Sequence, residues 1–298
     1  MTTHHFPTPG TVHLRVDNAA GSVTIATHDE PSTDVELSFE GPGDDETFLD
    51  QARVEANPTD DGYEVIVEIP RRHGGFGGML RWLVMNHGVR VAVKVPLDAT
   101  IDVRTASADV EGDGPFSSAS AKTASGRVQL GSVTGDVDVR TASGKVVVES
   151  VGGNASVDTA SGRIRLGSLS GEAHLRSASG RVTVEAAAAH LGVRTASGAV
   201  TVGDAAGDIE IATASGALRV DRLSGGQAKI RSVSGSILVG VAKGTTLHVD
   251  AQALSGSIDS EIELSPDWSP SEEHAPHELD LEIHSVSGSV RVVRADET

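Results

Sequence analysis

A glycine that recurs at a fixed interval constrains the fold of this chain more than any other feature. Within the motif TASG and its variants, the glycines stand 18 residues apart at Gly126, Gly144, Gly162, Gly180, Gly198 and Gly216. A second series lies midway between them at Gly135, Gly153, Gly171, Gly207 and Gly225, with Ala189 substituting once. The unit is therefore nine residues long and occurs twice in every 18. Such a short period is typical of a solenoid.

Each nine-residue unit has the pattern of one short strand followed by one turn. In "GRVQLGSVT", Val128 and Leu130 alternate with polar residues, and Gly and Ser bound the segment. This alternation predicts a half-buried strand, whereas a helix would need apolar residues three and four positions apart. We therefore expect an all-β fold, a β-solenoid (single-stranded β-helix) with an 18-residue coil of two nine-residue strand–turn units, capped at both ends. Residues 117–267 contain no Phe, Tyr or Trp, which indicates a thin core.

The ends of the chain are less regular than its middle and suggest three regions. Residues 1–100 form an N-terminal β cap region with early coil-like strands and an apolar, Gly-rich insertion at 71–88. Residues 101–256 carry the regular solenoid repeats, and residues 257–298 supply a C-terminal acidic loop and closing strands. Further strands are expected at 34–39, 63–69 and 89–95. Caps are expected because a bare solenoid end exposes both its core and its strand edges.

The repeated "RTASGxV" and its "SxSGxV" variants carry a resemblance to a known family. The chain resembles the bacterial putative-adhesin family of β-strand-repeat proteins, a domain family of unknown function, over residues 10–293. The resemblance implies a β-solenoid. It implies no catalytic residues.

The TASG corner lacks the partners that chemistry at a serine requires. A nucleophilic serine needs a nearby base, yet no histidine recurs with the period of Ser143 and its equivalents. Phosphate cradling needs a helix or a P-loop lysine, and calcium β-rolls need paired aspartates. His274 and His277 stand near carboxylates, but Pro276 argues against a helix that presents both of them. We therefore expect no catalytic residues, no metal site and no cofactor.

Net charge and hydropathy exclude several classes of function. A net charge of −18 disfavours specific nucleic-acid binding, because phosphates attract basic surfaces. No apolar run approaches the roughly 18 to 20 residues of a transmembrane segment. The start, "MTTHHFPTPG", lacks the pattern of a secretory signal, so we expect a cytoplasmic protein.

Basic residues flank the corners and are the main candidates for partner binding. If the coils stack in register, these residues form columns along one edge. They are Arg104, Lys122, Arg127, Arg140, Lys145, Arg163, Arg176, Arg181 and Arg194. The expected partner is an unknown protein or an anionic polymer. Two alternatives remain open, namely that the charges only keep the turns soluble or that they support self-association.

A second candidate surface is an apolar cluster within residues 71–88, made of Met79, Leu80, Trp82 and Leu83 with their neighbours. Such a cluster rarely stays exposed without a reason. It either plugs the N-terminal end of the solenoid or forms a docking flap.

These features favour a non-enzymatic β-solenoid scaffold or interaction protein. The alternative is a self-assembling, filament-forming structural protein, which would stack coils end to end. A carbohydrate-active solenoid enzyme is less expected, because an active face should interrupt the repeat with clustered acids and aromatics, and this repeat is uniform. The fold alone does not determine the function.

Overall fold

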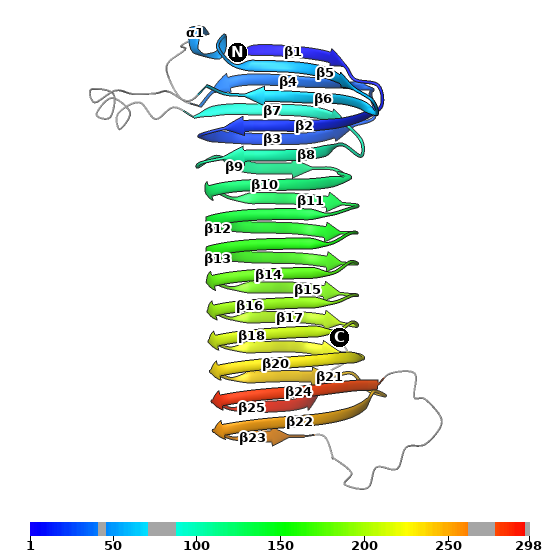
Figure 1. Cartoon of the computed structure of the whole chain (residues 1–298), viewed down its shortest axis with the longest axis vertical. Helices are drawn as coiled ribbons and strands as arrows, with labels where there is room; N and C mark the ends of the chain where they lie inside the picture. Colours follow the sequence, from blue (N-terminus) through cyan, green and yellow to red (C-terminus); the bar gives the residue numbers. More distant parts are fainter. Residues whose placement is uncertain (41–45, 71–87, 262–277, 296–298) are drawn as a thin grey trace, which may run out of the picture. The chain divides into compact units, whose positions relative to one another are not determined.

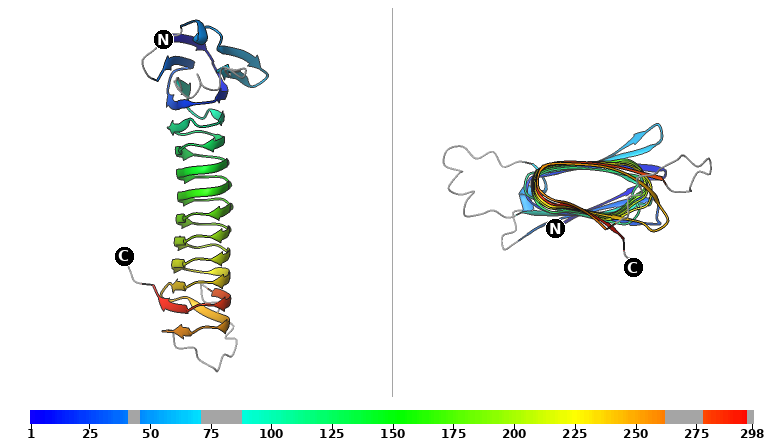
Figure 2. Two further views of the ribbon diagram at one scale, coloured as in Figure 1. Left: turned by 90° about the vertical axis from the view of Figure 1, so that its left-hand side faces the viewer. Right: turned by 90° about the horizontal axis from the view of Figure 1, so that it is seen from below.

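The computed structural model describes residues 1–40, 46–70, 88–261 and 278–295. The chain divides into two compact units, Met1–Glu149 and Ser150–Thr298. In each unit the strands stack in successive levels (Figures 1 and 2). Among the described residues the only helix is α1 (Glu46–Leu49), and none is long and apolar enough to cross a membrane.

The first unit contains the more varied strands. They are β1 (Thr2–Pro7), β2 (Thr11–Asn18), β3 (Gly21–His28), β4 (Ser32–Phe39), β5 (Arg53–Thr59), β6 (Gly62–Glu68), β7 (Val89–Pro96), β8 (Thr100–Thr105), β9 (Asp109–Asp113), β10 (Ser118–Ser125), β11 (Val128–Val133) and most of β12 (Val137–Val151). The predicted strands at 34–39, 63–69 and 89–95 correspond to β4, β6 and β7 and are confirmed.

The second unit is almost wholly built from the repeat. Its strands are β13 (Ala155–Leu169), β14 (Ala173–Ser179), β15 (Val182–Ala187), β16 (Leu191–Ser197), β17 (Val200–Ala205), β18 (Ile209–Ser215), β19 (Leu218–Leu223), β20 (Gly226–Ser234), β21 (Ile237–Val241), β22 (Thr246–Ser255), β23 (Ile258–Ser260), β24 (Glu278–Ser287) and β25 (Val290–Arg294).

From β8 to β19 the repeat strands pair in parallel with partners 18 residues away. Ala121 lies opposite Val139 in the first unit, and Val193 lies opposite Ile211 in the second. Within a strand, alternate side chains point inward, so Leu191 and Val193 are buried while Arg194 is exposed. Full burial of one such aliphatic side chain contributes about 1.5 to 3 kcal/mol. The chain is therefore an all-β, solenoid-like stack of parallel strands, as the repeat predicts.

The N-terminal end of the first unit changes from parallel to antiparallel pairing. Strands β2 and β3 lie between two levels, pairing in parallel with β6 and β7 on one side and with β8 and β9 on the other. Beyond them, β5 pairs antiparallel with β6, β4 with β7, and β1 with β4. These antiparallel strands interrupt the repeat at this end.

In the second unit the order of strands in space departs from their order in the chain. Strand β24 pairs with β20 on one side and with β22 on the other, and β25 likewise lies between β21 and β23. Figure 1 shows the late strands β24 and β25 above β22 and β23. Among the described strands, β22 and β23 are therefore the outermost pair of this unit. Their apolar side chains are poorly covered, since Leu254 is 85% and Ile258 is 43% exposed.

Candidate functional site

The TASG corners are built from stacked glycines. Gly198 has a φ of +149°, in the region that favours glycine, and Gly180 and Gly216 are similar. A Cβ atom on Gly198 would lie 1.7 Å from the carbonyl oxygen of Gly180 in the neighbouring level. The backbone groups also bond between levels, and the amide of Gly198 donates to the carbonyl oxygen of Ser215 at 3.0 Å. Glycine at the corner is thus a requirement of close stacking.

At several corners the threonine hydroxyl group bonds within the turn itself. Thr123 and Thr141 each donate a hydrogen bond from Oγ1 to the carbonyl oxygen two residues later, at 3.2 Å. Thr213 makes the same bond at 3.4 Å. The corner serines, such as Ser143, are exposed. This geometry agrees with the structural role that the sequence predicts for the motif.

The residues just before the corners lie in register from one level to the next within each unit. We call them the pre-corner column: Arg104, Lys122 and Arg140 in the first unit, and Asp158, Arg176 and Arg194 in the second. In the first unit Lys122 lies opposite both Arg104 and Arg140. In the second unit Arg176 lies opposite Asp158 and Arg194. The stacking that the repeat predicts therefore holds within each unit.

Most arginines of the pre-corner column are engaged with carboxylates. Arg104 Nη2 lies 3.1 Å from Asp102 Oδ2, and Arg140 Nη2 lies 3.3 Å from Asp138 Oδ2. In the second unit Arg176 pairs with Asp158 and Arg194 pairs with Glu210, at 4.0 and 3.5 Å. Surface pairs of this kind add little stability, but they neutralise the column locally.

Four basic residues come directly after a corner glycine, and we call them the post-corner cations: Arg127 and Lys145 in the first unit, and Arg163 and Arg181 in the second. The amide of Ile164 donates to the carbonyl oxygen of Arg181 at 2.9 Å, which places Arg163 and Arg181 on neighbouring levels. Within the described residues, no carboxylate forms an ion pair with any of these four side chains. The sequence did not distinguish them from the pre-corner column, because ion pairing depends on which acids the neighbouring strands bring close.

Part of the sequence prediction falls outside the described residues. The candidate docking flap of Met79, Leu80, Trp82 and Leu83 lies within residues 71–87, and His274 and His277 lie within residues 262–277. The structure therefore provides no geometry for these candidates.

A shallow depression in the second unit was not apparent from the sequence. It is lined by Ser156, Asp158, His174, Leu175, Arg176, His190, Gly192, Arg194 and Glu210. Gly192 lies opposite His174 in the sheet, and its missing side chain helps to form the hollow. The rings of His174 and His190 meet edge to face with centroids 5.9 Å apart. Because the two arginines here pair with Asp158 and Glu210, the depression has no marked charge preference.

A stack of parallel strands with tight glycine corners and exposed cations beside them defines a solenoid-like, all-β repeat protein. The chain belongs to the Toastrack DUF4097 family, whose model matches residues 11–203 and 185–293. This agrees with the resemblance carried by the RTASG motifs. A comparison with curated proteins found no match.

Solved structures of bacterial proteins are also similar to this chain. A putative adhesin from Parabacteroides merdae is 13% identical with a TM-score of 0.36, covering 98% of this chain and 96% of its own. A putative adhesin from Bacteroides fragilis is 12% identical with a TM-score of 0.32 and the same coverage. A putative cell adhesion protein from Clostridium sporogenes is 10% identical with a TM-score of 0.28, covering 98% of this chain and 99% of its own.

Proposed function

We propose that this chain is a non-enzymatic scaffold that binds a linear anionic polymer through its post-corner cations. The observation that carries the proposal is the contrast between two sets of basic residues. The pre-corner arginines Arg104, Arg140, Arg176 and Arg194 are paired with carboxylates. The post-corner cations have no ion pair among the described residues, so their charge is available to a partner.

The stacking of levels gives these cations a spacing that suits a polymer. Neighbouring parallel strands lie about 4.8 Å apart, so cations on adjacent levels repeat at about that distance. A linear polymer with regularly spaced anionic groups can contact both cations of a unit at once. Because the whole chain carries a net charge of −18, this attraction is local and weakens as salt screens it.

The scaffold role rests on the repeat itself. We infer a β-solenoid whose coil is 18 residues long, made of two nine-residue strand–turn units, with the antiparallel strands β1, β4 and β5 as its N-terminal cap. The absence of catalysis is part of the proposal. It is supported by the corner hydroxyls of Thr123 and Thr141, which donate to their own turn rather than to a general base.

The filament alternative finds less support. Filaments that grow by stacking coils need two ends that continue the parallel pairing. In the first unit, β4 and β5 pair antiparallel with β7 and β6, so the parallel repeat does not continue there.

Matched charge variants test the proposal. Variant A replaces the post-corner cations with glutamine (R127Q, K145Q, R163Q and R181Q), and variant B makes R104Q, R140Q, R176Q and R194Q. Each changes the net charge from −18 to −22. Binding of fluorescent heparin of defined length at low salt should weaken at least tenfold in variant A and much less in variant B. Equal loss in both variants, or no measurable binding by the wild type, would overturn the proposal.

A further inference from the structure

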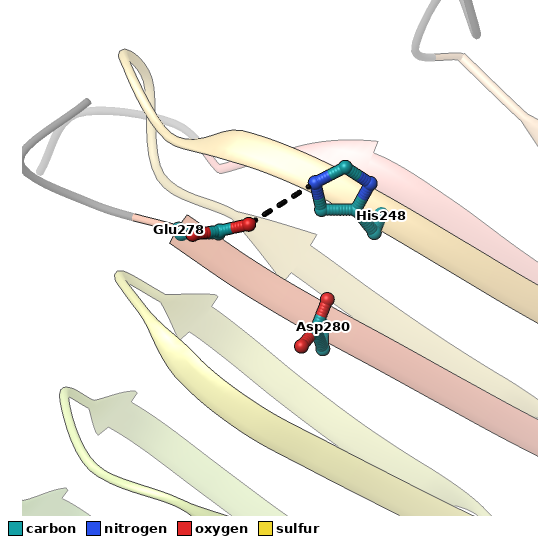
Figure 3. Close-up of side chains that lie close together, drawn as sticks. All are labelled: His248, Glu278 and Asp280. Atoms are coloured by element: carbon teal, nitrogen blue, oxygen red, sulfur yellow. Dashed lines mark ion pairs between the residues drawn. The ribbon is translucent and has the colours of Figure 1, made fainter. Parts of the chain in front are cut away.

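Three potential metal ligands meet on the outer face of the second unit, at the outermost strand pair. His248 on β22 lies directly opposite Asp280 on β24 in the parallel sheet. Glu278 is two residues before Asp280, so both carboxylates project from the same face of β24. One donor atom from each of the three side chains lies within 4.8 Å of the others (Figure 3).

The distances suit a small divalent cation after modest side-chain rotation. His248 Nε2 lies 3.3 Å from Glu278 Oε1. Zinc ligands lie about 2.0 to 2.2 Å from the metal, so two donors of a tetrahedral site stand about 3.4 Å apart. The side chains of His248 and Glu278 are 34% and 61% exposed, so an ion can reach the site from solvent.

The residues around the site add negative charge, and the β20 residue directly beside Asp280 is not a cation. On β20, the neighbour of Asp280 is the uncharged Gln227. The backbone N–H of Gln227 donates a hydrogen bond to Asp208 Oδ1 at 2.8 Å, which brings a further carboxylate to this end of the sheet. Lys229 is in register with Glu282, one outward position further along the strand. Two carboxylates held this close repel each other, and a bound cation would relieve that repulsion.

We propose that His248, Glu278 and Asp280 form a surface site for a divalent transition-metal ion of the zinc type. One imidazole nitrogen and two carboxylate oxygens are ligands that zinc accepts, and a fourth position stays open to water. Magnesium is a poorer match, since it prefers oxygen ligands in an octahedral shell. The ion joins β22, the outermost strand, to β24. Its role is therefore to hold the poorly covered end of the stack in place, and this role is independent of polyanion binding.

Calorimetric titration of the full-length, metal-stripped protein with Zn²⁺ tests the site. One Zn²⁺ per chain is expected, with affinity reduced more than about tenfold in H248Q and in D280N. The matched control is H174Q, an exposed histidine of the same outer face, which should bind as the wild type does. Unchanged affinity in H248Q and D280N would overturn the proposal. So would loss of binding in a variant carrying H274Q and H277Q while H248Q retains it.

Hydrogen exchange gives a second readout that tests the role of the ion. Zn²⁺ should slow exchange of the β22 amides in the wild type and in H174Q, and it should have no such effect in H248Q. If Zn²⁺ binds but the β22 amides exchange at the same rate with and without it, the proposed role at the end of the stack is wrong.

Discussion

The amide of Gly235 donates a hydrogen bond to the carbonyl oxygen of Ser287 at 3.1 Å, although 52 residues separate them in the chain. The next corner amide, of Gly288, donates in turn to Ser255 at 3.1 Å. The corner of the last strand pair therefore sits between two corners that precede it in sequence. The column of corner glycines continues across this change in strand order, because a Cβ on Gly288 would lie 2.0 Å from the carbonyl oxygen of Gly235.

The position of β24 between β20 and β22 predicts which engineered cysteines form a disulfide. Lys229 on β20 and Glu282 on β24 are opposite each other, and Asp250 on β22 lies opposite Glu282 on the far side. The chain has no native cysteine, so K229C/E282C should oxidise to a single intramolecular disulfide. Gel mobility with and without reductant, together with peptide mass mapping, measures it.

The control for this experiment is K229C/D250C. These positions are two strand spacings apart, about 9.6 Å, which is too far for a disulfide without backbone movement. Efficient oxidation of K229C/D250C with none for K229C/E282C would show that β22 follows β20 directly.

Substitution of a corner glycine should be costly. In Gly198→Ala the new methyl group meets the carbonyl oxygen of Gly180 at 1.7 Å, and the φ of +149° strains any side chain. We expect a loss of more than about 2 kcal/mol, seen as a lower urea midpoint. Gly131→Ala is the matched control, because its nearest neighbour would lie 3.6 Å away, and its effect should stay within about 1 kcal/mol. Similar midpoints for the two variants would contradict the stacking argument.

The Arg53–Glu55 pair predicts a shifted titration. Arg53 Nη2 donates a hydrogen bond to Glu55 Oε2 at 2.8 Å, and this bond lowers the pKa of Glu55. A lowered pKa favours the folded state at pH values above the ordinary range of the carboxyl group, and that contribution disappears as the pH falls through the folded pKa. Carbon-13 NMR of the Glu55 carboxyl should give a midpoint below the usual value, and R53Q should return it to normal. An unshifted midpoint in the wild type would show that the pair does not persist in solution.

Much of the fold could be predicted because the information is local. The alternation in "GRVQLGSVT" specifies a strand, and the glycine period specifies a corner, so both are readable within nine residues. The order in which the levels stack is not determined by such local information. Every coil presents a similar Val- and Ile-rich face, so nothing near Ser287 indicates that its corner lies between those of Gly235 and Ser255 rather than beyond that of Ser255.

For the candidate sites, too, the local features could be predicted from the sequence and the non-local contacts could not. Periodicity was sufficient to place Arg176 opposite Arg194, whereas the pairing of Arg194 with Glu210 depends on rotamers and on a neighbouring strand. The approach of His248 to Asp280 depends on the register between β22 and β24, so a search for closely spaced histidines could not find it. Cytoplasmic location stays a prediction, because backbone geometry does not encode it.

The salt dependence of heparin binding tests the central claim most directly. For the wild type, the logarithm of the association constant should fall linearly with the logarithm of salt concentration as counterions are released. If heparin releases counterions as a single-stranded nucleic acid does, each post-corner cation removed in variant A makes that slope shallower by about 0.7, whereas variant B keeps most of the wild-type slope. A slope in variant A equal to that of the wild type would contradict the assignment of Arg127, Lys145, Arg163 and Arg181 as polymer-binding residues.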